Sequence, residues 1–408
     1  MTSTAKQRTL DLAEQYLCPD RVRFLTGAGI DLVIGRREGY RIWDVDGREL
    51  LDIHLNGGVY NLGHRNQKVI EALTEALQTL DIGNHHFPST ERAALAQRLV
   101  SLTPGMQYAV FASGGGEAVD LAIKSARRAT GHRRIVSVTD AYHGHTGLAL
   151  AAGDEQAAAS FLSTDPDVAR VPFNDAEALA GALREPAAAV ILETVPATAG
   201  FPRPSADYLP AVRRLCDEAG ALYIADEVQT GLGRSGRMWA VESFGVQPDV
   251  LVTGKGLSGG IYPIAATLLN DRAGQWLQTD GWGHVSTFGG AELGCRVAQR
   301  VLDLTEQAMP DVAQAIAAWR DELAALQVAY PQWVLEVRQT GLIIGLRFAH
   351  EAGGMLMTRL LYDAGVWAMF AGFDRSVLQV KPGLLMTALD RQRVLDALDR
   401  ACAAAVAL

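Results

Sequence analysis

The sequence predicts an α/β fold, with a central and mainly parallel β-sheet flanked by helices and a smaller α+β domain toward the C-terminus. From about residue 68, helical segments alternate with short runs that are apolar at consecutive positions. Such runs indicate strands covered on both faces, as in a parallel sheet between two layers of helices. After about residue 290 the alternation gives way to a different pattern.

The expected strands of the sheet are short and rich in β-branched residues. They lie at 109–113, 134–139, 189–193, 221–227 and 249–256. Helices are expected between most of them, because segments such as 208–220 carry their apolar residues on one helical face. Gly220 then ends that helix.

The two ends of the chain follow other patterns. Residues 39–53 are typical of a hairpin that turns at Asp46 and Gly47. Near the other end, a helix at 291–308 is expected to lead through another helix to strand-like residues 335–348. A helix, a strand and a terminal Ala-rich helix follow, which is why we expect a smaller α+β domain there.

The composition narrows the class of protein. The chain has 408 residues, of which 49% are hydrophobic and 20% charged, with a formal net charge of −9. This balance is typical of a soluble globular protein with a large core. Because no run of Lys and Arg stands out, neither a nucleic acid nor an anionic membrane is expected as a partner. No apolar stretch approaches the ~20 residues that span a bilayer.

Cysteine usage favours a reducing compartment. Cys18, Cys216, Cys295 and Cys402 lie far apart without a C-x-x-C pair, so neither a disulfide framework nor a metal site is indicated. The N-terminus, MTSTAKQRTLDLAEQ, is too polar for the apolar region of a signal peptide. We therefore expect a cytoplasmic location.

The segment ALYIADEVQTGLGRSG, residues 221–236, places two carboxylates at the end of an expected strand. Asp226 and Glu227 thus lie where a parallel sheet presents its ligand crevice. A carboxylate there can bind a metal ion, act as a base or pair with a cationic ring nitrogen. A helix cap or a solvated acidic pair is the structural alternative.

The segment DVLVTGKGLSGG places Lys255 after the next strand, between Gly254 and Gly256. A lysine between glycines can reach a bound carbonyl compound, because the local backbone offers no steric cover. The Walker A pattern G-x-x-x-x-G-K-[ST] is absent. A solvated loop lysine is the alternative, and the acid on the preceding strand argues against it.

The segment AVFASGGGEAVDLAIKSA runs from a strand through Gly114, Gly115 and Gly116 into a helix that begins at about Glu117. Free backbone N–H groups and the helix dipole make such a turn an anion site suited to phosphate. Three glycines can also form a simple tight turn, but the acid and the lysine that follow strengthen the phosphate interpretation.

Together these segments resemble the class III (subgroup II) aminotransferases, which are fold-type I enzymes that use pyridoxal 5′-phosphate (PLP). The resemblance runs from about Tyr40 to Thr387 and is densest over 109–290. It implies a small domain built from the C-terminal part and the N-terminal segment. We expect an N-terminal segment at 1–65, a large PLP-binding domain at 66–300 and a C-terminal small domain at 301–408.

The resemblance implies an enzyme that moves an amino group from an amino acid or amine to a 2-oxo acid or aldehyde. Lys255 and Asp226 are the implied catalytic residues. PLP would form a Schiff base with Lys255, whose freed amine could carry the 1,3-proton shift. Asp226 would pair with the pyridine nitrogen and keep the ring protonated, so that it accepts electrons when the Cα–H bond breaks.

Further cofactor contacts follow from the same resemblance. Gly115 and Gly116 fall on the phosphate-binding turn. Tyr142, in AYHGHT, matches the aromatic residue that stacks on one face of the ring, and Val228 matches the residue that covers the other face.

Three more residues complete the implied cofactor site. Gln229 matches the neighbour of the ring hydroxyl, and Glu193 matches an acid at the end of a strand. Thr287, in HVSTFGG, matches a phosphate ligand that the partner subunit supplies. The resemblance therefore implies a homodimer with shared active sites.

Some positions depart from the family pattern. Gly116 replaces a hydroxyl residue of the phosphate turn, and Thr198 replaces a glutamate. Gln379 replaces an arginine that binds a substrate carboxylate, while Lys381 lies beside Pro382. Without that bidentate cation, an ornithine- or acetylornithine-type substrate is not expected.

The substrate residues and the reaction leave alternatives open. Tyr60, Trp43 and Lys381 are candidates for substrate contact, and ordinary packing is the alternative for the two aromatic residues. The same scaffold could also support an aminomutase, decarboxylase, racemase or phospho-lyase reaction. A PLP-binding protein without catalysis is a third hypothesis, against which the intact Lys255 and Asp226 argue.

Overall fold

The computed structural model describes residues 4–408, and its centre is a seven-stranded sheet with the strand order β4-β10-β9-β8-β7-β5-β6. The strands are β4 (Tyr108–Ala112), β5 (Ile135–Val138), β6 (Val168–Val171), β7 (Ala189–Glu193), β8 (Leu222–Asp226), β9 (Val250–Thr253) and β10 (Ala265–Leu269). Strand β10 runs antiparallel to β4 and β9, and the remaining neighbours are parallel. The predicted α/β fold with a mainly parallel sheet is confirmed.

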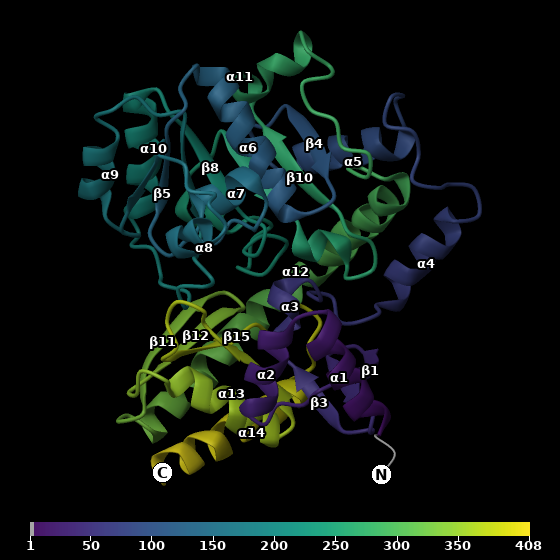
Figure 1. Ribbon diagram of the computed structural model, residues 1–408, viewed down its shortest axis with the longest axis vertical. Helices are drawn as coiled ribbons and strands as arrows, with labels where there is room; N and C mark the ends of the chain where they lie inside the picture. The colour runs from purple at the N-terminus through teal and green to yellow at the C-terminus, as the bar shows by residue number, and fades with distance from the viewer. Residues whose placement is uncertain (1–3) are drawn as a thin grey trace.

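Helices cover both faces of this sheet, which fills the upper half of Figure 1. They include α5 (Thr90–Ser101), α6 (Gly115–Thr130), α7 (Gly147–Ala152), α8 (Glu155–Ser160), α9 (Ala176–Ala182), α10 (Tyr208–Ala219) and α11 (Asp271–Gly274). Helix α4 (Gln67–Ala76) lies away from the sheet and packs against the long helix α12 (Glu292–Ala329). In β7, Val190 and Leu192 join the core formed with α9 and α10, whereas Ile191 packs with α6. Because successive side chains of a strand point to opposite faces, β7 is apolar at consecutive positions from Ala189 to Leu192.

Two strands of the sheet were missed by the sequence analysis. Strand β6 is four residues long and only partly buried over most of its length, so its apolar signal is weak. Strand β10 has the sequence AATLL, and all of its residues are buried. Its pairing with β4 joins segments far apart in the chain, which local patterns do not reveal.

The N-terminal elements pack with the C-terminal ones, as the purple and yellow-green segments in the lower half of Figure 1 show. The first small sheet has the order β1 (Ile34–Glu38), β2 (Arg41–Asp44), β3 (Glu49–Asp52) and β13 (Val366–Trp367). Strands β2 and β3 form the predicted hairpin, and Gly47 in its turn has φ +89°. The parallel pairing of β3 with β13 joins the two ends of the chain.

A second small sheet is antiparallel throughout and lies beside the first. Its order is β11 (Val334–Thr340), β12 (Ile343–Phe348), β15 (Val377–Val380) and β14 (Met369–Phe370). The helices of this half are α1 (Ala5–Tyr16), α2 (Pro19–Gly27), α3 (Leu55–Gly58), α13 (Gly353–Asp363) and α14 (Ala388–Val406). Three short 3₁₀ helices complete the description: η1 (Ala240–Phe244), η2 (Lys255–Ser258) and η3 (Gln275–Gln278).

One helix, α12 (Glu292–Ala329), extends over 38 residues where the sequence analysis expected two helices. Pro310 lies inside it, and a proline removes one hydrogen bond of the helical ladder. Apolar residues on both sides of the proline, such as Leu304 and Val312, enter the same core. This shared packing explains why the helix continues through Pro310.

Within residues 4–408, no helix has the length and apolar character needed to cross a membrane. The residue ranges given for the three parts of the chain stay predictions, and α12 continues without a break across residue 300.

Candidate active site

The carboxyl ends of three neighbouring parallel strands form the candidate site. Glu193 ends β7 and is paired in register with Asp226, which ends β8. Lys255 follows β9, the next strand. A cavity of about 150 Å³ lies here, lined by Gly115, Gly116, Tyr142, His143, Gly144, Glu193, Asp226, Val228, Gln229 and Lys255. The structure thus brings together eight of the sequence-predicted cofactor residues, all but Thr287.

The glycine turn at the start of α6 forms one wall. Gly114 is the N-cap residue and has no side chain to occupy the N–H groups of the first turn. A Cβ atom on Gly115 would lie 3.0 Å from Val228 Cγ1, and one on Gly254 would lie 3.6 Å from that atom. A side chain at Gly115 would therefore crowd Val228. Without one, the backbone of the turn lines the cavity at a helix N-terminus, which suits a phosphate group.

Asp226 is buried and has two fixed partners. Its Oδ1 atom accepts a hydrogen bond from the backbone N–H of Val228 at 3.0 Å. Its Oδ2 atom lies 2.8 Å from Nδ1 of His143, which donates when that nitrogen carries the proton. A carboxylate held in this way keeps its position in the cavity.

His143 is a site residue that the sequence analysis missed. It is buried, and its Nε2 atom has no hydrogen-bond partner within the described residues. The only local signal is its place next to Tyr142, in a loop after β5. Its bond to Asp226 joins residues 83 positions apart, so only the folded structure reveals the pair.

Glu193 is buried beside this pair. Its two oxygens accept hydrogen bonds from the backbone N–H groups of Tyr142 and Ala197, both at 3.1 Å. Burial raises the pKa of Glu193 to about 7; the carboxylate of Asp226 adds to that rise, while His143 opposes it. Glu193 therefore keeps a proton at mildly acidic pH.

Lys255 reaches the cavity from a strained backbone position, with φ +40°. A Cβ atom on Gly57 would lie 3.3 Å from Lys255 Cε and 3.5 Å from Gln229 Oε1, so α3 closes over both side chains. Burial lowers the pKa of the Lys255 amine, and Asp226 and Glu193 oppose that effect. A neutral amine is therefore easier to reach here than in water.

The three candidate substrate residues, Tyr60, Trp43 and Lys381, lie in different surroundings. The Tyr60 ring stacks on His64, with 3.8 Å between ring centroids, and lines a separate cavity of about 650 Å³. Trp43 lies on β2, with the Arg36 guanidinium 4.3 Å from its ring centroid, and does not line the cavity at Lys255. Lys381 is fully buried, and its amine donates to Gln379 Oε1.

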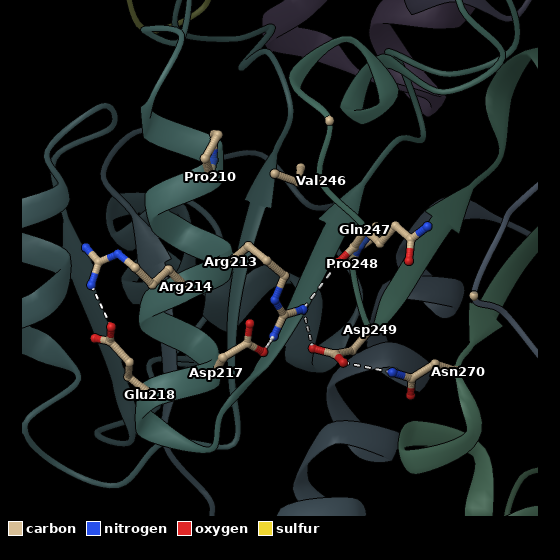
Figure 2. A pocket seen from close by; sticks show the side chains of 12 residues that line it. Pro210, Arg213, Arg214, Asp217, Glu218, Val246, Gln247, Pro248, Asp249 and Asn270 are labelled. Carbon is tan, nitrogen blue, oxygen red and sulfur yellow. Dashed lines mark hydrogen bonds and ion pairs between the residues drawn. The ribbon is translucent and has the colours of Figure 1, made fainter.

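A larger cavity, of about 710 Å³, lies at the opposite end of the sheet (Figure 2). Asp249 in its wall precedes β9, whereas Lys255 follows that strand. Every charged side chain of this wall is paired: Arg213 bonds both Asp249 at 2.7 Å and Asp217 at 2.6 Å, and Arg214 bonds Glu218 at 2.8 Å. The cavity therefore offers no unpaired cation or nucleophile to a ligand, and we place the chemistry at the smaller cavity. No cluster within residues 4–408 has the His, Cys, Asp or Glu side chains to hold a metal ion.

The sequence model of the class-III aminotransferases matches residues 26–402 of this chain. The chain belongs to the class-III aminotransferase family. Among its relatives, an uncharacterized aminotransferase of Archaeoglobus fulgidus is 47% identical over 384 residues, which cover 93% of this chain and 90% of the relative. The putrescine aminotransferase of Pectobacterium atrosepticum is 33% identical over 407 residues, which cover 95% and 87%.

Solved structures agree with this membership. The ornithine aminotransferase of Toxoplasma gondii is similar with a TM-score of 0.90 and 25% identity, over 99% of this chain and 96% of that one. A second structure of that enzyme is described with partial occupancy of PLP at its active site. Class-III aminotransferases use PLP, so family membership confirms the predicted transaminase activity and its cofactor.

The buried carboxyl group of Glu193 gives a pH prediction for the cofactor-free protein. The pKa of Glu193 is about 7 in the folded state, and its ordinary value is 4.5. Between pH 4.5 and 7, the folded protein therefore keeps a proton on Glu193 that the unfolded chain has lost. The free energy of unfolding is therefore unaffected by the titration of Glu193 below pH 4.5, where the group is protonated in both states, and it falls as the pH rises from 4.5 to about 7. The loss should be on the order of 3 kcal/mol.

In the Glu193→Gln variant, the fall in stability between pH 4.5 and 7 should be smaller by about that amount. Urea unfolding of the cofactor-free protein across this range measures it. Glu218→Gln, which changes an exposed acid on α10, is the matched control and should leave the wild-type profile intact. If the Glu193→Gln profile matched that of wild type, Glu193 would titrate at its ordinary pKa.

Proposed function

We propose that this aminotransferase holds PLP on Lys255 and transfers an amino group from an amino acid or amine to a 2-oxo acid or aldehyde. One observation carries the proposal: the amine of Lys255, the carboxylate of Asp226 and the turn at Gly115 and Gly116 line the same cavity. These groups match the aldehyde, the ring nitrogen and the phosphate of PLP. The glycine turn fits the phosphate, because it lines the cavity at the N-terminus of α6 with backbone N–H groups that no side chain covers.

Each residue of the cavity is assigned a task in this proposal. PLP supplies a carbonyl group for the exchange of amines and a protonated ring that accepts electrons. Asp226, oriented by His143, holds the ring nitrogen and its proton. Tyr142 and Val228 bound the two faces of the ring, while Gln229 and Glu193 are placed along its edge.

Lys255 performs the proton transfer at the substrate carbon. Its amine must be neutral to accept a proton, and burial lowers its pKa in that direction. Gly57 packs close to the Lys255 side chain, since a Cβ atom added to Gly57 would lie 3.3 Å from Lys255 Cε. This packing limits where the amine can move. Lys255 therefore stays within reach of both the cofactor and the substrate.

Lys381 is the cation that we propose for a substrate carboxylate. It is buried, and Gln379 Oε1 accepts its hydrogen bond. Burial lowers the pKa of its amine well below the ordinary value, and the cations Arg234 and Lys255 add to the effect. A carboxylate would relieve this unfavourable environment, since an anion beside the amine favours its charged form.

We also propose a homodimer, with Thr287 reaching the active site of the partner. Thr287 is exposed in the single chain, and apolar side chains around it are exposed as well. Phe87, Trp282 and Phe288 have exposed fractions of 67%, 65% and 59%. An apolar surface of this kind is typical of a protein–protein interface.

A cytoplasmic location completes the proposal. The four cysteines are free, which suits a reducing compartment. Recovery of the protein from another compartment in a cell fractionation would contradict this location.

Borohydride reduction of the holoenzyme should attach the cofactor to Lys255. The chain has five lysines, Lys6, Lys68, Lys124, Lys255 and Lys381, so peptide mapping distinguishes them all. Lys255→Ala should lose the label and at least ~1,000-fold in kcat, because it removes the nucleophile and the proton carrier together. Lys68→Ala is the control and should behave as wild type. A label on Lys381 would overturn the assignment.

Lys381→Met should separate substrates that carry a carboxylate from those that do not. With a 2-oxo acid, kcat/KM should fall roughly 10- to 100-fold, the size expected for one hydrogen bond to a charged group. With an aldehyde acceptor it should stay within about twofold of wild type. Equal losses with both acceptors would show that Lys381 supports the fold and does not bind the carboxylate.

Mixed dimers should reveal whether the active site is shared. At limiting PLP, Lys255→Ala and Thr287→Val dimers should each be nearly inactive. In a heterodimer, one site combines Lys255 of one subunit with Thr287 of the other. Random exchange of the two variants should therefore restore about a quarter of wild-type activity, since half of the dimers carry one intact site of two. Activity equal to the average of the two parents would contradict a shared site.

A further inference from the structure

The turn that faces the cofactor phosphate has no hydroxyl of its own, because its three residues are glycines. Gly116 is the second residue of α6. A Cβ atom on Gly116 would lie 2.8 Å from Oγ1 of Thr146 and 3.2 Å from its Cγ2. The Thr146 side chain therefore occupies the space that a side chain at position 116 would need.

Thr146 is the N-cap residue of α7, but its hydroxyl does not cap that helix. An N-cap threonine usually accepts a hydrogen bond from the N–H of the second or third helical residue. Here the N–H of Ala149, the third residue, donates to Asp120 Oδ1 at 2.7 Å. Asp120 therefore caps this helix in place of Thr146, and the Thr146 hydroxyl is not engaged in capping where it lies beside the turn of α6.

The loop that carries Thr146 is packed tightly against the same turn. Gly144 has φ +112°, and a Cβ atom there would lie 2.8 Å from Gly116 Cα and 3.3 Å from Gly116 N. Both glycines line the cavity at Lys255. The backbone contact fixes the position of Thr146 relative to the phosphate turn.

We propose that the Thr146 hydroxyl donates a hydrogen bond to the phosphate of the bound cofactor. The inference rests on the proposed function. In this inference Thr146, in the loop before α7, supplies the hydroxyl donor that the glycine turn lacks. A phosphate monoester is dianionic near neutral pH and offers three acceptor oxygens, so an added hydroxyl strengthens its binding.

Affinity for PLP tests this assignment without any measurement of turnover. Absorbance titration of the cofactor-free protein should give a Kd for Thr146→Val that is roughly 10- to 100-fold above wild type, and for Thr146→Ser within about threefold. Pyridoxal, which lacks the phosphate, should bind the wild type and Thr146→Val equally. Thr74→Val is the matched control: Thr74 is exposed, and its hydroxyl donates to Ile70 O of its own helix.

Moving the hydroxyl to the turn is the second test. Gly116→Ser alone should weaken PLP binding, because its Cβ atom would lie 2.8 Å from Thr146 Oγ1. The double variant Gly116→Ser with Thr146→Ala removes that conflict, returns a hydroxyl to the turn and should regain most of the wild-type affinity.

Three results would overturn the inference. They are a wild-type Kd for PLP in Thr146→Val, an equal loss of pyridoxal binding, and a double variant no better than Thr146→Ala alone. Failure of the proposed function is distinguishable, since the wild-type protein itself would then neither bind PLP nor carry a borohydride label on Lys255.

Discussion

Parallel register among β7, β8 and β9 sets Glu193 opposite Asp226 and Asp226 opposite Val252. Because parallel strands end at the same edge, the polar residues that follow them converge without any contribution from the loops. Both faces of these strands are buried, so a slip of one residue would exchange the side chains of the two cores and disturb the packing of both. The site is therefore as fixed as the core beneath it.

Burial then determines the charges of the site. Low solvent access raises the pKa of Glu193 and lowers that of Lys255, so each group moves toward its neutral form. Arg234 shows the same effect, with its pKa lowered to about 10 by burial. Its guanidinium donates to Asn61 Oδ1 at 2.8 Å and to the backbone oxygens of Leu342 and Pro382. It thereby ties the loop after β8 to both ends of the chain.

Much of this arrangement could be predicted from the sequence, because β7, β8 and β9 are apolar at consecutive positions up to their carboxyl ends. Asp226 ends one of these strands and Lys255 lies two residues after the next, so their convergence needs only the parallel order. His143 and Thr146 could not be found in this way. Each acts on a residue from a distant segment, and neither distance nor orientation is encoded in a local pattern. The continuous α12 was missed for a related reason, since packing on both sides of Pro310 outweighs the lost hydrogen bond.

Two of the departures from the family pattern, at Gly116 and Gln379, concern a hydroxyl and a cation, and they share a geometric feature. Gln379 and Lys381 are two residues apart in extended chain, so their side chains lie on the same face, about 7 Å apart along it. The residue before a proline favours this extended conformation, and Pro382 follows Lys381. A cation at position 381 therefore lies on the same face of the chain as one at position 379 would, but about 7 Å further along it. Gln379 links the two positions, because it accepts from Lys381 and donates to Ala197 O at 2.6 Å. In both cases a group of the same chemistry lies close to the departed position: Lys381 beside Gln379, and the Thr146 hydroxyl 2.8 Å from where a Cβ atom of residue 116 would lie.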